Sequence, residues 1–290
     1  MTPTNQTKSL VLLLLSTLFI SSTALAQVNL QGVWRATYAE DQADRIPGPE
    51  IADFVGLPVN AANRVRALSW DASLLTLPEY QCRVHPSDYA NQFNNIRIWE
   101  ERNLITEELI AIHLKHAVWE THRVIWMDGR EHPTEYAEHT SMGFSTGRWD
   151  GHILTVKTTH LTEGWLRRNG VARSDMATVT EHFIRNEDIL SWTVRVVDPV
   201  YLEEPFVRNR DYYYSTDIQI PPYPCESVTE VERERGEIPH YLPGLNPLLT
   251  EFSEYNDIPF EAAMGGAASM YPEYMEALEA MLEAQGGNAR

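Results

Sequence analysis

Residues 176–185 read MATVTEHFIR and residues 189–197 read ILSWTVRVV, with Asn186-Glu187-Asp188 between them. In the second segment, four apolar side chains alternate with polar ones: Leu190, Trp192, Val194 and Val196. Alternation with a period of two is typical of a β-strand that buries one face. Two such segments joined by a short polar turn predict an antiparallel hairpin.

More strands are predicted on both sides of this hairpin. They comprise residues 28–38, 96–102, 109–114, 118–127, 153–159 and 206–214. Asp128-Gly129 and Asp150-Gly151 are dipeptides typical of tight turns. A series of about eight short antiparallel strands predicts a mostly β fold, either an up-and-down barrel or a half-barrel. The sequence lacks the strand–helix alternation of a parallel doubly wound sheet.

Two further segments do not follow the strand pattern. Residues 43–95 are an irregular insertion, in which 59–70 predict a helix. Residues 226–290 are an acidic C-terminal appendage, in which 272–284 predict a helix with apolar side chains on one face: Met275, Leu278, Met281 and Leu282. We expect the appendage to wrap the barrel, to dock a protein partner or to be a loosely ordered tail. The predicted barrel domain spans residues 27–225.

The start of the chain has the three parts of a secretory signal peptide. Lys8 provides a basic start, residues 10–20 are an apolar run, and Ala24-Leu25-Ala26 fits the small-x-small cleavage pattern. The apolar run is too short to span a bilayer. We therefore expect residues 1–26 to be removed near Ala26, and the mature protein to be periplasmic or extracellular.

Charge and cysteine content restrict the partners and the compartment. The formal net charge of −18 disfavours binding to nucleic acid, and no segment predicts membrane insertion. In an exported chain, Cys82 and Cys225 are most simply joined by one disulfide. Two free thiols or a metal-binding pair are the alternative.

Gly32-Val33-Trp34 in the first predicted strand resembles the Gly-x-Trp start of lipocalins and other calycins. In that group the tryptophan packs across the closed end of the barrel, beneath an arginine from the last strand. The resemblance implies a calycin-like barrel, in which Arg208 or Arg210 would provide that arginine.

A second set of motifs resembles a family of uncharacterised exported bacterial proteins. Its members carry R-x-I-x-M-D-G-R-x-H-P, M-G-x-S-x-G-R-W-x-G, a W-L pair and E-R-F. The matching segments here are residues 123–133, 142–151, 165–166 and 181–183, and the resemblance covers about 120–215. The chain departs from the pattern at Phe144 and Arg173, where relatives usually have histidine. The resemblance implies export and a barrel, but it implies no reaction.

The chain has ten histidines, so we asked whether any of them are spaced like metal ligands. His113, His116 and His122 are close in sequence, but on one continuous strand only His116 and His122 would share a face. A metal needs three or four converging ligands, and no His-x-His or His-Glu-x-x-His pattern is present. We therefore expect no metal, and the absence of nucleotide-binding glycine motifs implies no phosphate cofactor.

One acid–base pair is predicted inside the barrel. Glu181 lies on the apolar face of its strand, and Arg123 is the natural partner for a carboxylate buried there. The pair would either orient a ligand or lock the structure. Ser145 lies in a Gly-x-Ser-x-Gly motif, but the strand–turn–helix context of an esterase is missing, which disfavours a serine hydrolase.

Aromatic residues are the last candidates. Trp149, Trp165 and Tyr212 would line a ligand cavity together with Arg123 and Glu181, and Trp165, in a loop, would lie at its mouth. The favoured hypothesis is an exported binding protein for a small hydrophobic or aromatic molecule. One alternative is a cofactor-free isomerase, cyclase or hydrolase that uses Glu181 and Arg123. The other is a docking protein that binds its partner through residues 226–290.

Overall fold

The structure is a computed structural model that describes residues 28–37, 49–90, 94–117 and 121–288. The predicted signal peptide and residues 43–48 of the insertion lie outside these ranges. No helix within them has the length and apolar character needed to cross a bilayer.

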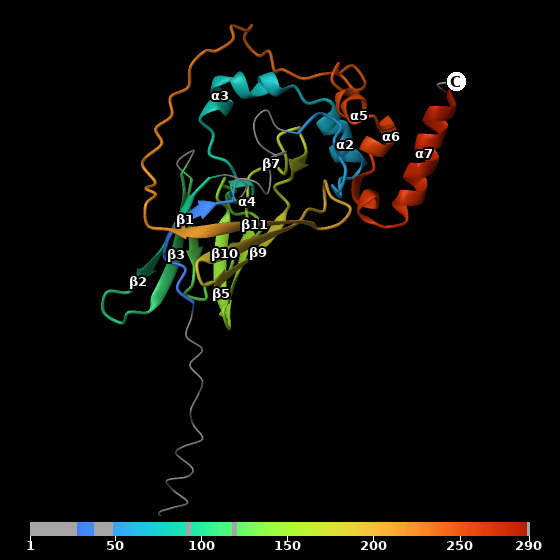
Figure 1. Ribbon diagram of the computed structural model, residues 1–290. Helices are drawn as coiled ribbons and strands as arrows, with labels where there is room; N and C mark the ends of the chain where they lie inside the picture. Colours follow the sequence, from blue (N-terminus) through green and yellow to red (C-terminus); the bar gives the residue numbers. More distant parts are fainter. Residues whose placement is uncertain (1–27, 38–48, 91–93, 118–120, 289–290) are drawn as a thin grey trace, which may run out of the picture.

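Nine strands close into a barrel in the order β1-β11-β10-β9-β6-β5-β4-β3-β2 (Figure 1). They are β1 Gly32–Ala36, β2 Ile96–Arg102, β3 Leu109–His116, β4 His122–Trp126, β5 Phe144–Asp150, β6 Ile153–Thr159, β9 Thr178–Asn186, β10 Ile189–Val197 and β11 Phe206–Ser215. This confirms the mostly β barrel. The strand in addition to the expected eight is β5, which sequence reasoning treated only as an approach to the Asp150-Gly151 turn.

The barrel is not a pure up-and-down meander, because β4 and β5 are parallel. Residues 127–143 carry the chain back to the start of β5. His132 from this crossover forms hydrogen bonds with Thr146 Oγ1 of β5 at 2.9 Å and Thr159 Oγ1 of β6 at 2.8 Å. Asp128-Gly129 marks a bend, with Gly129 at φ +78°, and the chain then enters the crossover and not a hairpin.

The hairpin of β9 and β10 agrees with its prediction, including the buried face of Leu190, Trp192, Val194 and Val196. Asn186 pairs with Ile189, so the connection is shortened to Glu187 and Asp188. Glu187 has φ +54°, the left-handed conformation that two-residue hairpin turns require.

Trp34 closes one end of the barrel, as the calycin resemblance implied. Its ring is fully buried and meets the ring of Tyr214 edge-on at 5.3 Å. A Cβ at Gly32 would lie 2.4 Å from the Tyr214 ring, so this position requires glycine. The arginine over Trp34 is Arg185 of β9, at 5.0 Å, and not Arg208 or Arg210. The prediction was wrong because Arg208 and Arg210 lie further along β11, where they donate to the carbonyls of Leu166 and Thr37.

The insertion covers the other end of the barrel (Figure 1). It contains α2 Ala61–Leu68, the 3-10 helix η2 Ala72–Thr76, α3 Pro78–Gln81 and α4 Ser87–Ala90. The short strands β7 Gly164–Trp165 and β8 Ala172–Arg173 pair beside it. Asn60 caps α2 by accepting a hydrogen bond from the Asn63 backbone, which explains why this predicted helix begins at Ala61.

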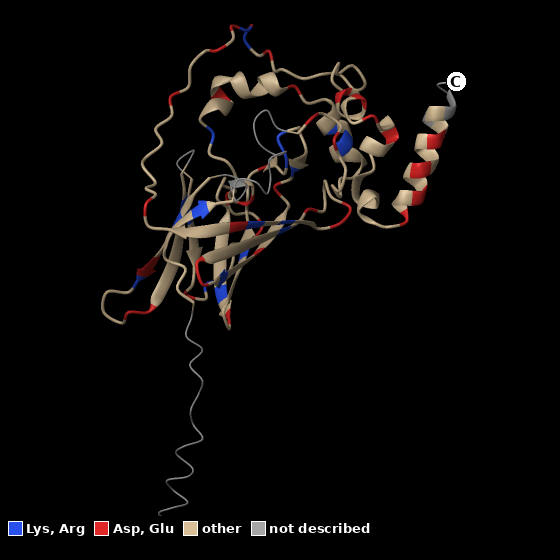
Figure 2. Ribbon diagram, in the orientation of Figure 1, with Lys and Arg blue, Asp and Glu red and all other residues tan. Residues whose placement is uncertain are grey.

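The appendage contacts the insertion. It contains α5 Glu251–Tyr255, α6 Phe260–Ala263, the 3-10 helix η3 Gly266–Met270 and α7 Tyr274–Asn288. The backbone N–H of Phe54 donates to Ala263 O at 3.1 Å, and that of Gly56 donates to Ser269 Oγ at 2.8 Å. Helix α7, whose exposed side chains include several acidic ones (Figure 2), leaves Met275 and Leu282 of its predicted apolar face exposed.

The predicted disulfide joins Cys82 and Cys225, whose Cα atoms are 5.7 Å apart. It fastens the segment after β11 to the end of α3. The barrel strands from β2 to β11 therefore lie within a covalent loop.

Candidate functional site

Arg123 and Glu181 form the buried pair that the strand pattern predicted. Arg123 Nη1 donates to Glu181 Oε1 at 2.8 Å, and Arg123 Nη2 donates to Glu181 Oε2. The two side chains are 1% and 0% exposed, so water reaches neither charge. Such a bidentate pair in the barrel interior is stable only when its remaining hydrogen-bonding groups are also satisfied.

The lumen supplies those partners. Arg123 also donates to Ser145 Oγ at 3.0 Å and to Thr158 Oγ1 at 2.6 Å. The Trp192 indole donates to Glu181 Oε1 at 3.0 Å. The pair is thus a closed network surrounded by buried side chains, which fits the structural lock better than a ligand-orienting site.

The other residues predicted for a ligand cavity lie apart from one another. Tyr212 is fully buried, with its ring 6.2 Å from that of Trp192. Trp149 lies near the end of β5 and packs against the hydrophobic core. Trp165 lies in β7 at the covered end of the barrel, whereas Arg123 lies in β4 in the barrel interior. The structure therefore does not bring these residues into one pocket.

The histidines are arranged differently from the predicted pattern. His116 is buried, with its ring 5.8 Å from that of Trp192, whereas His113 and His122 meet on the outer face of the sheet. The parity argument was wrong because β3 ends at His116 and His122 begins β4, its antiparallel neighbour, so these histidines do not lie on one strand. In the described part of the chain, no three His, Cys, Asp or Glu side chains form a group that could hold a metal.

A cleft of about 70 Å³ opens between the insertion and β7, and it is the best candidate site. Its aromatic wall consists of Trp70, Tyr80 and Trp165. The Trp165 ring is nearly parallel to that of Tyr80, at 21° and 6.4 Å between centroids, and meets Trp70 edge-on at 5.2 Å. A second, smaller hollow lined by Trp165 reaches Val196 and Phe206 at the barrel end. Trp165 therefore lines a cleft at the covered end of the barrel.

Charged groups surround the aromatic wall. The Arg83 guanidinium lies 4.6 Å from the centre of the Tyr80 ring. Arg66 donates to Glu163 Oε2 at 3.1 Å and to the Tyr201 hydroxyl at 2.8 Å. Arg83 is exposed, and no ion pair of its side chain is found among the described residues, so it can meet an anionic group in the cleft.

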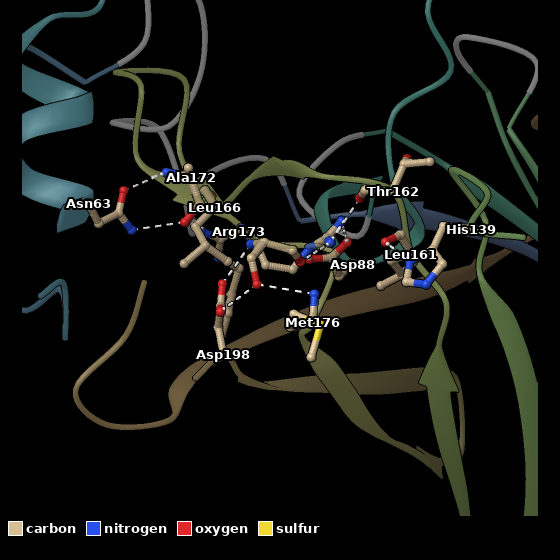
Figure 3. Close-up of polar contacts among 12 residues, drawn as sticks. Asn63, Asp88, His139, Leu161, Thr162, Leu166, Ala172, Arg173, Met176 and Asp198 are labelled. Atoms are coloured by element: carbon tan, nitrogen blue, oxygen red, sulfur yellow. Dashed lines mark hydrogen bonds and ion pairs between the residues drawn. The ribbon is translucent and has the colours of Figure 1, made fainter. Parts of the chain in front are cut away.

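Buried polar contacts hold β8, the partner strand of β7, against the insertion (Figure 3). Arg173, fully buried in β8, donates to Asp88 Oδ2 of α4 at 2.9 Å and to the carbonyls of Thr162 and Ser174 at 2.9 and 2.8 Å. The Asn63 side chain of α2 bonds both the N–H and the carbonyl of Ala172. Arg173, where the resemblance led us to expect histidine, therefore joins α4 of the insertion to the segment that contains β7 and β8.

His85 also lines the cleft, and its surroundings disfavour the protonated imidazole. Burial, together with the charge of Arg168, lowers the pKa of its imidazole to about 4. Because the unfolded chain binds this proton near the ordinary value of 6.5, stability is lost as the pH falls below 6.5.

When the pH falls from 8 to 5, we expect the protonation of His85 in the unfolded chain to lower the free energy of unfolding by about 2 kcal/mol. Urea unfolding of the wild type and of His85→Gln at both pH values measures this difference. His152→Gln, at an exposed turn, is the matched control and should retain the full pH dependence. An equal pH dependence of the His85 variant and the wild type would contradict the assignment.

Sequence reasoning missed most of this cleft. Trp70, Tyr80, Arg83 and His85 lie in a proline-containing segment without clear periodicity, which was interpreted as irregular. The aromatic residues clustered within 70–89 were the available signal, but their contacts with Trp165 depend on tertiary structure.

The comparisons with known proteins leave the function open. No family model matches the chain, and no curated protein matches it. Among solved structures, a variant of the fluorescent protein UnaG matches with a TM-score of 0.28 and 11% identity, covering 65% of this chain and 97% of that one. At this TM-score the likeness supports no inference. The closed barrel is established by its own strand pairing.

Proposed function

We propose that this chain is an exported protein that binds a small aromatic molecule carrying an acidic group. The binding site is the cleft between the insertion and β7, outside the barrel lumen. The aromatic wall of Trp70, Tyr80 and Trp165 beside the guanidinium of Arg83 is the observation that carries the proposal.

The aromatic wall sets the shape of the ligand. Two parallel rings about 7 Å apart contact a third flat ring placed between them. Tyr80 and Trp165 are 6.4 Å apart, so a small opening of the cleft admits one ring. A single water takes about 10–15 Å³ on the same measure, and a cleft of about 70 Å³ therefore suits one ring and not a large polycyclic molecule.

The charges set the polarity of the ligand. Arg83 and Arg168 are cationic, whereas Glu163 is already paired with Arg66. A carboxylate on the ligand ring would meet Arg83 at the open side of the cleft. Such an ion pair would fix the orientation of a ligand whose ring is stacked in the cleft.

The lumen does not compete with the cleft as a ligand site. Arg123 and Glu181 use their polar atoms on one another and on Ser145, Thr158 and Trp192. A ligand or substrate at this pair would have to displace those bonds in a water-free interior. The proposal therefore assigns Arg123 and Glu181 to stability and places recognition at the mouth.

We expect Trp165→Ala to weaken binding of 4-hydroxybenzoate by roughly ten- to thirtyfold, since removing a buried aromatic contact costs about 1.5–2 kcal/mol. Isothermal titration of the mature protein, from residue 27 onwards, measures the change. Trp165→Phe should retain most of the affinity because it keeps a stacking ring. 4-Hydroxybenzyl alcohol, which has no charge, should bind more weakly than the acid.

Trp126→Ala is the matched control. Trp126 lies at the end of β4, with the Arg130 guanidinium over its ring, away from the cleft. Equal affinity in the Trp165→Ala and Trp126→Ala proteins, or no binding of any single-ring aromatic acid by the wild type, would refute the proposal.

A further inference from the structure

A second hollow, of about 350 Å³, lies beside the aromatic cleft and has about five times its volume. Trp70 lines both, so the cleft and the hollow share one wall. Three parts of the chain meet around the hollow: the insertion, the loop between β7 and β8, and the appendage near α5 (Figure 1). The proposed binding of an aromatic acid makes no use of this space.

Hydrogen bonds from two buried amides hold these three parts together. Asn169 Nδ2, from the loop between β7 and β8, donates to the carbonyl of Glu50 at 3.0 Å. Asn246 Nδ2, from the appendage, donates to the carbonyl of Trp70 at 3.1 Å. The two asparagines are only 1% and 4% exposed. The walls of the hollow are therefore fixed before a ligand binds, which lowers the entropy that binding costs.

Two buried polar atoms of the lining have no hydrogen-bond partner in the described part of the chain. They are Trp70 Nε1, which is a donor, and Asn169 Oδ1, which is an acceptor. The Asn169 amide cannot turn over to relieve this, because its Nδ2 is held by the carbonyl of Glu50. A ligand that supplies the missing partners gains affinity, since a buried polar atom without a partner is destabilising. One acceptor and one donor are what the C=O and N–H of a peptide group provide.

Charges of both signs border the hollow. Arg168 is its cation, and no hydrogen bond or ion pair of the Arg168 side chain is found among the described residues. The same holds for the carboxylates of Glu50 and Glu251, which also line the hollow. A ligand that carries both a carboxylate and an ammonium group therefore complements this lining better than a ligand with a single charge.

The remaining lining and the volume indicate the size and polarity of the rest of the ligand. Pro49, Ile51 and Leu248 present apolar surface, which favours aliphatic side chains. A volume of about 350 Å³ is at the lower end of the range for small-molecule sites. It suits a molecule of dipeptide size.

We propose that this hollow binds a short peptide of dipeptide size, with free ends and aliphatic side chains. The carboxylate of the peptide pairs with Arg168, and its ammonium group pairs with Glu50 and Glu251. Its peptide group bonds Trp70 Nε1 and Asn169 Oδ1. This site goes beyond the aromatic-acid cleft, because an aliphatic peptide has no ring to stack between Tyr80 and Trp165.

Isothermal titration of the mature protein with L-leucyl-L-leucine tests the site. We expect one peptide to bind per chain. The N-acetyl peptide, which has no ammonium group, and the peptide amide, which has no carboxylate, should each bind roughly tenfold more weakly. Arg168→Gln should weaken binding of the free peptide by roughly tenfold, and it should bind the free peptide and the amide equally. Glu251→Gln should reduce the difference between the free and the N-acetyl peptide in the same way.

Arg148→Gln in β5 and Glu254→Gln in α5 are the matched controls, because each removes an exposed charge outside the hollow and should keep the wild-type affinity. Circular dichroism confirms that each variant is folded. The proposal is overturned if the wild type does not bind the dipeptide, if blocking either end leaves the affinity unchanged, or if Arg168→Gln binds as Arg148→Gln does. Glu251→Gln should bind 4-hydroxybenzoate as the wild type does, which separates the hollow from the aromatic cleft.

Discussion

Glu181→Gln lowers the free energy of unfolding by about 3–5 kcal/mol, because it leaves the Arg123 guanidinium charged and unbalanced in a water-free interior. Glutamine has nearly the same size as glutamate, so the loss of stability comes from the missing charge and not from a cavity. It also places an NH₂ group where the carboxylate accepts from Arg123 or Trp192. Urea or guanidinium unfolding at pH 7 measures the effect.

Asp217→Asn is the matched control for this variant. Asp217 accepts from Arg35 at 3.1 Å, but the two side chains are 74% and 49% exposed. An exposed pair contributes only about 0–1 kcal/mol. A similar loss of stability in both variants would contradict the structural role of the buried pair.

A double variant distinguishes the effect of removing both charges from the effect of leaving one charge without its partner. Arg123→Met combined with Glu181→Leu removes both charges, and we expect it to be more stable than Glu181→Gln alone. Replacing a whole buried ion pair by apolar side chains is often neutral, whereas removing one partner is strongly destabilising. Ser145 and Thr158 keep their mutual hydrogen bond of 2.9 Å in that variant.

Local sequence patterns were sufficient to predict the barrel and this pair. The alternation in 189–197 specifies which face of β10 is buried, and the same parity places Glu181 in the lumen opposite Arg123. The disulfide was predicted from the number of cysteines together with the predicted signal peptide. These inferences succeed because each depends on strand periodicity or composition, which are properties of short segments.

The features that the sequence did not reveal depend on contacts between distant segments. The parallel pairing of β4 with β5 requires a crossover of 17 residues, 127–143, whose His132 forms hydrogen bonds with β5 and β6. Trp34 is covered by Arg185, which lies at the hairpin end of β9, and not by Arg208 or Arg210, which lie nearer the start of β11. The aromatic cleft needs Tyr80 and Trp165, which are 85 positions apart, and no local pattern relates them.

Replacing both Cys82 and Cys225 with serine should lower the free energy of unfolding by about 2–5 kcal/mol, the largest effect after that of the buried pair. The bridge spans a sequence separation of 143 residues, so its absence releases a long loop in the unfolded chain. The chain-entropy estimate for such a loop is about 5 kcal/mol and is an upper bound.

The bridge also has a local consequence, because it holds the segment after β11 against α3. Gln81 accepts from the Val228 backbone at 2.7 Å and donates to Glu230 at 3.0 Å, and both contacts are exposed to water. Exposed hydrogen bonds of this kind do not hold a segment alone, so residues 216–245 should become sensitive to limited proteolysis in the double serine variant.

This local effect connects the bridge to the proposed binding site. Tyr80 lies two residues before Cys82, and its position beside Trp165 depends on how firmly α3 is held. We expect the double serine variant to bind 4-hydroxybenzoate more weakly at a temperature where its barrel is still folded. Unchanged unfolding midpoints and unchanged proteolysis would show that the insertion and the appendage hold α3 without the covalent link.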